Sequence, residues 1–136
     1  MIGKRLLFGC AMGIVGCSQA TPINGNPCQA YLNEASRVEV TATGQVARVL
    51  GLRNGPSGAH EGFIMKLPNC NNSLFTVKVE DNVSFAGNIP LTEGDTLIVK
   101  GEYEYYPRGG VIHWTHRDPR GRHAGGYIEF NGKRYQ

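Results

Sequence analysis

From Arg37 onward the chain is a series of short segments in which apolar and polar residues alternate, separated by residues that favour turns. Such alternation is typical of strands that bury one face. The segments are RVEVTATGQVARVLGL, EGFIMKL, LFTVKVE, TLIVKGEYEYY and VIHWTHR, at residues 37–52, 61–67, 74–80, 96–106 and 111–117. Nineteen glycines are spread along the chain, and Gly44 predicts a bulge in the first strand. The sequence therefore predicts an all-β fold rather than a helical bundle.

Two features at the ends of this region complete the expected architecture. Asn26 and Pro27 suit the N-cap and the first position of a short helix. The apolar face of that helix is expected to carry Cys28, Tyr31, Leu32 and Ala35. At the other end, GYIEFNGKRY at residues 126–135 predicts a closing β-hairpin, because Asn-Gly favours the type I′ turn that joins two strands.

The N-terminus has the pattern of an export signal. Lys4 and Arg5 precede an apolar run that is too short to span a bilayer comfortably. The run ends in IVGC, which is similar to a bacterial lipobox; the resemblance implies that Cys17 becomes the first mature residue and carries lipid. Ser18, where an aspartate would indicate inner-membrane retention, then favours an outer-membrane lipoprotein facing the periplasm or the exterior. The alternative is cleavage near Ala20, which discards Cys17.

This pattern divides the chain into three parts. Residues 1–16 are the expected signal peptide, 17–26 a tether and 27–136 a single domain. Export places the domain in an oxidising compartment, where Cys28 and Cys70 are most simply a disulfide. That bond would close a loop of about 43 residues and stabilise the fold by roughly 4 kcal/mol.

The order of the segments resembles an OB-fold, a small five-stranded Greek-key barrel, over residues 36–116. A long first strand with a central glycine comes first, and L-x-x-G-D-x-L-x-V-x-G-x-Y, at residues 91–103, looks like the entry to the fourth OB strand. The chain also resembles an exported bacterial family known only as a domain of unknown function. HEGFIMKL, GDTLIVKGEYEY and GGVIHWTHRDPRGRHAGGYIEFNGKRYQ carry this resemblance, which implies the architecture and export but no activity.

Positive charge gathers at the C-terminal end. The whole chain has a net charge of +3, but residues 28–107 hold six basic and nine acidic side chains, whereas residues 108–136 hold six basic and two acidic ones. Such asymmetry is either an anion-binding surface or a solvated polar rim.

Most of the candidate chemistry lies in residues 109–126. In a straight strand over residues 111–117, His113 and His116 would point to opposite faces, which disfavours a metal site on that pair. Asp118-Pro-Arg-Gly suits a type I turn in which Asp118 caps its own turn. A hairpin closed by this turn would place Arg117 opposite Arg122, and His116 opposite His123.

Two hypotheses about the function of this hairpin follow, and the first is an enzyme. His116 and His123 are candidate catalytic residues of a metal-assisted phosphodiesterase or nuclease. As ligands of a divalent metal they need a third partner, for which His60 is the first candidate and Glu61 and Glu104 are others.

In the other reading the domain is a binding module. Trp114, Arg117, Arg120 and Arg122 would contact single-stranded nucleic acid or an envelope glycan, since bases and sugars stack on aromatic rings and phosphates pair with arginine. A third alternative is a structural envelope protein, in which the aromatic side chains form the barrel wall and the histidines pack on Trp114. Convergence of the three histidines within ligand distance would favour the enzyme. Dispersed histidines with arginines that line a groove would favour the binding module, and buried aromatic rings with scattered arginines would favour the structural protein.

Overall fold

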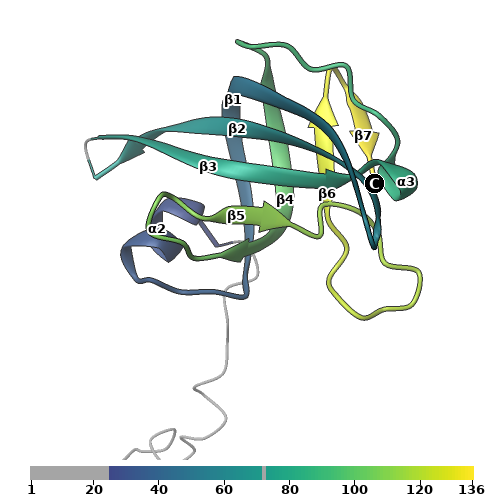
Figure 1. Ribbon diagram of the computed structural model, residues 1–136. Coiled ribbons are helices and arrows are strands. Elements are labelled where there is room, and N and C mark those ends of the chain that lie inside the picture. Colours follow the sequence, from purple (N-terminus) through teal and green to yellow (C-terminus); the bar gives the residue numbers. More distant parts are fainter. Residues whose placement is uncertain (1–24, 72) are drawn as a thin grey trace, which may run out of the picture.

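The computed structural model describes residues 25–71 and 73–136. Cys17, the expected signal peptide and nearly all of the tether lie outside the described residues. The elements, shown in Figure 1, are α2 (Pro27–Leu32), β1 (Val38–Gly55), β2 (Gly58–Cys70), β3 (Ser73–Asn82), α3 (Val83–Ala86), β4 (Thr96–Glu104), β5 (Val111–His113), β6 (Tyr127–Phe130) and β7 (Lys133–Tyr135). Within the two described ranges, neither helix has the length and apolar character needed to cross a membrane.

The strands close into a barrel because β1 pairs with two partners. Its first part, from Val38 to Gln45, pairs with β4, and its second part, from Gln45 to Gly55, pairs with β2. The sheet order is β1-β2-β3-β5-β4-β6-β7 with an additional β1–β4 pairing, and β3 runs parallel to β5. This is the five-stranded order of an OB-fold, with β6 and β7 attached to β4 as a hairpin, as the sequence predicted.

Alternating side chains fill the barrel. In β4 every second residue is buried, beginning with Leu97, and Tyr103 is the largest side chain with no exposed surface. Gly44 faces the same interior. A Cβ at Gly44 would lie 2.6 Å from Cγ of Met65, so the glycine is needed for close packing. The bulge predicted at Gly44 is displaced along the strand, to the register shifts between Val46 and Gly51.

The helix α2 is tied to the barrel as expected. The side chain of Asn26 accepts a hydrogen bond from the backbone N–H of Cys28, and Cys28 forms a disulfide with Cys70. The expected packing face is wrong at two positions, because Leu32 is 48% exposed and Ala35 lies beyond the end of the helix at Leu32. Ala30 is buried instead. In the closing hairpin, Asn131 and Gly132 both have positive φ, as a type I′ turn requires.

The largest departure from the sequence prediction concerns the fifth strand. It ends at His113 rather than Arg117, and Trp114 adopts a left-handed backbone with φ of 56°. Residues 114–126 therefore form a loop, called here the Arg loop, in place of the predicted strand and hairpin. Conversely, residues 53–60, expected as a loop, mostly extend β1 and β2 up to a tight turn.

Replacing both Cys28 and Cys70 with serine is expected to lower the free energy of unfolding by about 4 kcal/mol, because the unfolded chain regains the entropy of a loop with a sequence separation of 42 residues. Urea unfolding followed by circular dichroism measures the change. The wild-type protein unfolded in the presence of a reductant should match the double variant. An identical unfolding midpoint with and without reductant would contradict the prediction.

Candidate functional site

The Arg loop leaves the barrel at one edge of β4. β5 pairs with β4 at Glu102–Glu104, and β6 pairs with the same strand at Ile98–Lys100, so the two strands follow one another along β4. The loop bulges outward between them (Figure 1). The backbone N–H of Gly126 donates to the carbonyl oxygen of His116, and this bond brings the ends of the loop together. A Cβ at Gly126 would collide with the carbonyl oxygens of Trp114 and Lys100, so this return requires glycine.

Asp118 organises the backbone of the Arg loop. Its carboxylate accepts hydrogen bonds from the backbone N–H groups of Arg120, Arg122 and His123. Its carbonyl oxygen accepts from the N–H of Gly121, which closes the expected turn. Partial burial alone would raise the pKa of Asp118, but these three donors and nearby His123 outweigh it and hold the pKa below its usual range. A carboxylate that caps several N–H groups gives a surface loop one defined shape.

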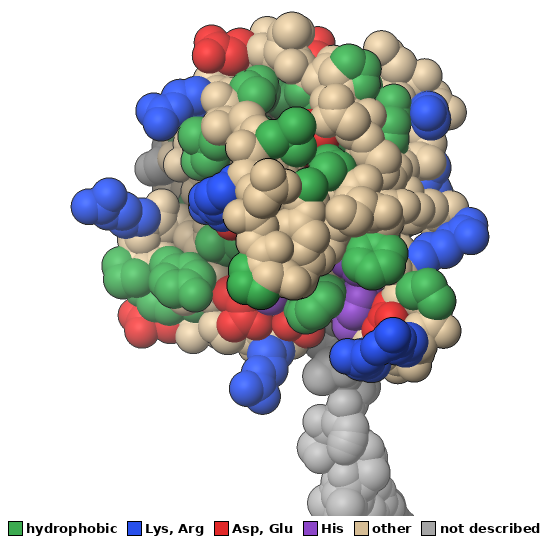
Figure 2. Space-filling view, turned by 45° about the vertical axis from the view of Figure 1, so that its right-hand side comes forward, with side chains coloured by type: hydrophobic (Ala, Val, Ile, Leu, Met, Phe, Trp, Pro, Cys, Tyr) green, Lys and Arg blue, Asp and Glu red, His purple; other side chains and the backbone are tan. Residues whose placement is uncertain are grey.

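Five aromatic rings form a continuous cluster at the base of this loop, called here the ring cluster. The rings belong to Phe85, His113, Trp114, His116 and His123. The His116 ring stacks on Phe85 at 4.8 Å between centroids and meets His123 edge-on at 5.1 Å. Trp114 lies 4.4 Å from His123 and remains 42% exposed. On the face in Figure 2, histidine side chains lie among hydrophobic and acidic groups, with lysine or arginine side chains projecting nearby.

The structure thus brings His116 and His123 together, although no hairpin ladder joins them. In each residue Nδ1 lies 2.7 Å from the carbonyl oxygen of the next residue, so Nδ1 must carry the proton and donate. His116 is 5% exposed, and Nε2 of His123 has no hydrogen-bond partner. These contacts show that both rings help to hold the conformation of the loop.

The arginines behave differently from the histidines. Arg117, Arg120 and Arg122 are all exposed. Across residues 25–71 and 73–136, no hydrogen bond or ion pair involves their guanidinium groups. The loop therefore carries three unpaired cations as well as the exposed Trp114 ring.

Two acidic side chains close one end of the barrel. Glu61 and Asp81 lie opposite each other on β2 and β3 and both point inward. The hydroxyl of Thr115 donates to Oδ1 of Asp81 at 2.6 Å, whereas Oδ2 has no partner. Burial raises the pKa of Asp81 to about 7, and the carboxyl of Glu61 adds to the effect although the Thr115 bond opposes it. Thr115, near the start of the Arg loop, is therefore bonded to a carboxyl whose pKa is raised toward neutral pH.

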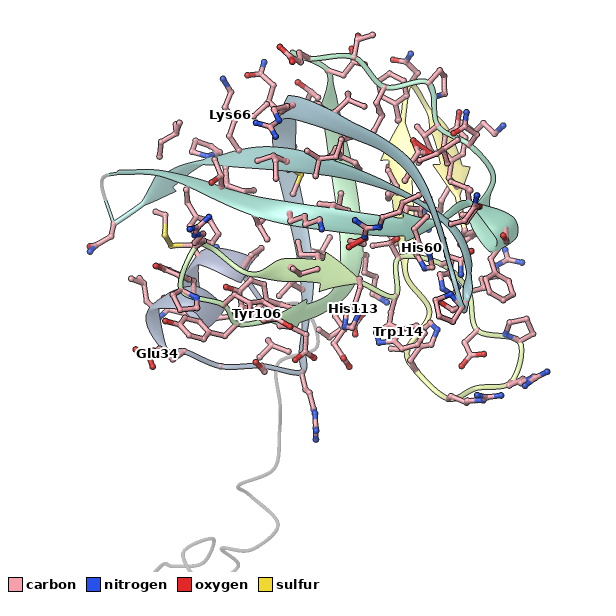
Figure 3. All side chains as sticks on the ribbon, viewed as in Figure 1. Glu34, His60, Lys66, Tyr106, His113 and Trp114 are labelled. Atoms are coloured by element: carbon pink, nitrogen blue, oxygen red, sulfur yellow. A yellow bond between two sulfur atoms is a disulfide. The ribbon has the colours of Figure 1, made fainter. Side chains whose placement is uncertain are left out.

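The structure does not bring His60 into a ligand set with His116 and His123. Its Nδ1 donates to the carbonyl of Gly58, and the side chain lines a shallow pocket beside Arg53. Within the part of the chain that the structure describes, one set of three possible metal donors lies close together: Glu102, Glu104 and His113. Figure 3 labels His113 and Trp114 next to each other, where β5 passes into the Arg loop.

The sequence analysis did not predict the roles of Asp81 and Glu102, although the pattern of buried residues marks Asp81. Asp81 continues the inward alternation of Phe75, Val77 and Val79, and a carboxyl in phase with buried residues marks an unusual position. Glu102 lacked such a signal. Its partnership with His113 depends on the β4–β5 register, which the sequence did not reveal.

The strand order and the exposed ring and arginines define the class: an OB-fold barrel with a candidate ligand-binding loop at the β5–β6 junction. The chain belongs to the family described as "Protein of unknown function (DUF3465)", whose model matches residues 14–136. Comparison with curated proteins gives no match.

Several solved structures are similar to this chain. A small single-stranded DNA-binding protein from Streptomyces coelicolor has 19% identity and a TM-score of 0.45, covering 56% of this chain and 84% of its own. The N-terminal domain of PriB from Thermoanaerobacter tencongensis has 18% identity and a TM-score of 0.45, with coverages of 55% and 87%. The second OB-fold domain of replication protein A from Methanococcus maripaludis has 12% identity and a TM-score of 0.44, with coverages of 74% and 91%. At these identities the similarity concerns the fold alone.

The raised pKa of Asp81 predicts how stability depends on pH. The folded chain holds the Asp81 proton up to about pH 7, against a usual pKa of 3.8, so folding takes up a proton between these values and stability falls as the pH rises. Asp81→Asn keeps an acceptor for Thr115 but cannot ionise. We expect this variant to lose less stability than the wild type between pH 5 and pH 8, measured by thermal unfolding. Glu93→Gln, at an exposed turn, is the control and should keep the wild-type dependence; the same dependence in Asp81→Asn would refute the assignment.

Proposed function

We propose that this protein is an exported, lipid-anchored binding module whose ligand is single-stranded nucleic acid. The observation that carries the proposal is that one ordered loop carries both the exposed ring of Trp114 and three exposed, unpaired arginines. Stacking on an aromatic ring and pairing of phosphates with guanidinium groups are the two contacts that proteins use to hold single strands without reading their sequence.

The backbone at Trp114 supports a binding role. A bulky residue with φ of 56° costs conformational energy, and such strain is found most often at functional sites. Here it turns the ring out of the strand. His113 and His123 pack against the ring, at 5.3 and 4.4 Å between centroids. These contacts restrict the orientation of the Trp114 ring, on which a base could stack.

The order of the Arg loop supports the same role. Asp118 fixes the backbone of Arg120 and Arg122, so a ligand would not have to order this segment on binding. The side chains of these arginines face solvent. Because they make no internal ion pair within the described residues, phosphates would not compete with protein carboxylates for them.

The proposed location is the outer membrane, with Cys17 carrying the lipid. The lipobox-like IVGC motif supports the anchor, and the Cys28–Cys70 disulfide agrees with an oxidising compartment. Stable anchoring would need more than one acyl chain, each buried CH₂ contributing about 0.8 kcal/mol.

Replacing both Arg120 and Arg122 with alanine is expected to weaken binding and to flatten its salt dependence. Each lost phosphate contact removes about 0.7 from the slope of log affinity against log salt for a single strand, so the slope should fall by about 1.4. The measurement is the fluorescence anisotropy of a labelled single-stranded oligonucleotide, titrated with full-length protein in detergent at several salt concentrations.

The matched control removes the same charge elsewhere. Arg37→Ala with Lys133→Ala lies outside the Arg loop, and both side chains are exposed, so the slope should change less. Stacking predicts that the ligand also quenches the fluorescence of Trp114, the one tryptophan of the chain. Equal affinity and slope in the Arg120/Arg122 variant would remove nucleic acid as the ligand. An anisotropy that falls below the value of the free oligonucleotide would indicate cleavage and favour the nuclease.

The lipid anchor is tested separately. Cys17→Ser is expected to abolish labelling of the protein by radioactive palmitate and to move it out of the membrane fraction, because the acylated thiol is gone. Cys10→Ser is the control: Cys10 also follows a glycine, but few apolar residues precede it, so labelling should persist. Palmitate labelling that survives Cys17→Ser would exclude this anchor.

A further inference from the structure

A row of titratable side chains crosses the outside of three neighbouring strands. The backbone register places Glu39 of β1 opposite Glu102 of β4, and Glu102 opposite His113 of β5. Glu104 follows two residues after Glu102 and shares its face of the strand. Three carboxylates and one imidazole are therefore held side by side by backbone pairing rather than by flexible loops.

The distances between side-chain atoms in this row suit coordination of one cation better than a direct hydrogen bond between the side chains. Nε2 of His113 lies 3.4 Å from Oε1 of Glu102 and 3.7 Å from Oε2 of Glu104, and all three donor atoms lie within 4.8 Å of one another. Two ligands that bind one tetrahedral Zn²⁺ at about 2.0–2.1 Å are themselves about 3.3 Å apart. The two histidine–carboxylate separations are close to that value.

Two buried polar atoms in the row have no hydrogen-bond partner. Nε2 of His113 and Oε1 of Glu39 are both inaccessible to solvent, and neither makes a hydrogen bond. Buried polar atoms in folded proteins are nearly always paired, so an unpaired one indicates a missing partner. The His113 atom faces the two carboxylates, where a cation would meet it.

The negative charge of the carboxylates on this surface also favours the binding of a cation. Glu39 and Glu102 lie directly opposite each other, and like charges in that position destabilise a sheet. In the ranges that the structure describes, the ion pairs of Glu102 and Glu104 involve His113 alone. Glu80, by contrast, on nearby β3, is paired with both Arg53 and Lys78 at 3.0 Å.

We propose that Glu102, Glu104 and His113 bind a divalent transition-metal cation, with Zn²⁺ as the preferred ion. Two carboxylate oxygens and one imidazole nitrogen are a donor set that Zn²⁺ accepts, whereas Mg²⁺ favours oxygen ligands and water. Three protein ligands leave a fourth position for water or for an oxygen atom of a ligand. If the proposed function holds, a phosphate approaching Trp114 would meet this cation instead of two uncompensated carboxylates.

Metal titration of the full-length protein in detergent tests the site without any nucleic acid. After treatment with a chelator, Zn²⁺ binding is measured by calorimetry. Co²⁺ is added in parallel, since a paramagnetic ion bound at His113 should quench Trp114, whose ring centroid is 5.3 Å from that of His113. We expect one Zn²⁺ per chain, quenching by Co²⁺, and reversal of the quenching by Zn²⁺.

Variants of the proposed ligands test which residues bind Zn²⁺. Glu102→Gln and Glu104→Gln should each weaken Zn²⁺ binding by at least about 100-fold, since loss of even an outer-shell partner costs about 10–100-fold. Glu93→Gln removes the same charge at an exposed turn and should bind like the wild type. Circular dichroism confirms that each variant folds. Wild-type Zn²⁺ affinity in both glutamine variants would overturn the proposal, as would loss of binding only in the His116→Ala, His123→Ala double variant. Failure to bind Zn²⁺ would leave oligonucleotide binding by the Arg loop unaffected, so the two proposals fail separately.

Discussion

β1 pairs with both β2 and β4, and this double pairing closes the barrel and decides where the Arg loop leaves it. An open sheet would leave β4 at an edge, whereas closure pairs one side of β4 with β1 from Thr96 to Tyr103. The other side of β4 is shared by β5 and β6 in succession. The chain between them has no place in the barrel, and it emerges as the Arg loop. Gly44 contributes to the closure because a side chain there would collide with Met65.

The same closure gives the two ends of β4 different surroundings. Near Glu102 and Glu104, the outer face of the strand meets β1 and β5 and gathers carboxylates around His113. Toward Lys100, the strand supports the returning end of the Arg loop, where the lysine ammonium donates to the carbonyl of Gly125. An acidic surface and a basic loop thus lie on either side of Trp114, whose backbone conformation marks the boundary between them.

The sequence predicted the elements of the barrel well, because each element could be identified from residues that are neighbours in the chain. Alternation identified every strand of the ring, the Asn26–Pro27 pair identified the start of α2, and Asn131–Gly132 identified the last turn. The errors occurred where tertiary packing overrides a local preference. VIHWTHR alternates as a strand should, yet pairing with β4 stops at His113, because the chain turns away at Trp114.

For the candidate site the sequence indicated the right stretch but only part of the arrangement. It predicted that His116 and His123 would be neighbours and that Asp118 would cap its own turn, and both predictions agree with the geometry. The neighbourhood of the two histidines has a different origin from the hairpin register expected for it. His60, predicted as their third partner, faces the pocket beside Arg53. The stacking of Phe85 on His116 joins residues from α3 and the Arg loop, which no sequence spacing connects.

The amino-acid sequence is enough to predict the all-β character, the order of the barrel strands, the helix cap and the pairing of Cys28 with Cys70. These depend on the spacing of residue types along the chain and on the small number of cysteines. Two other features follow from the folded barrel: residues 114–126 form a loop rather than a hairpin, and Glu102, Glu104 and His113 share one surface. Both outcomes depend on which segments of β4 remain available after the barrel closes, and that is a property of strand register rather than of residue pattern.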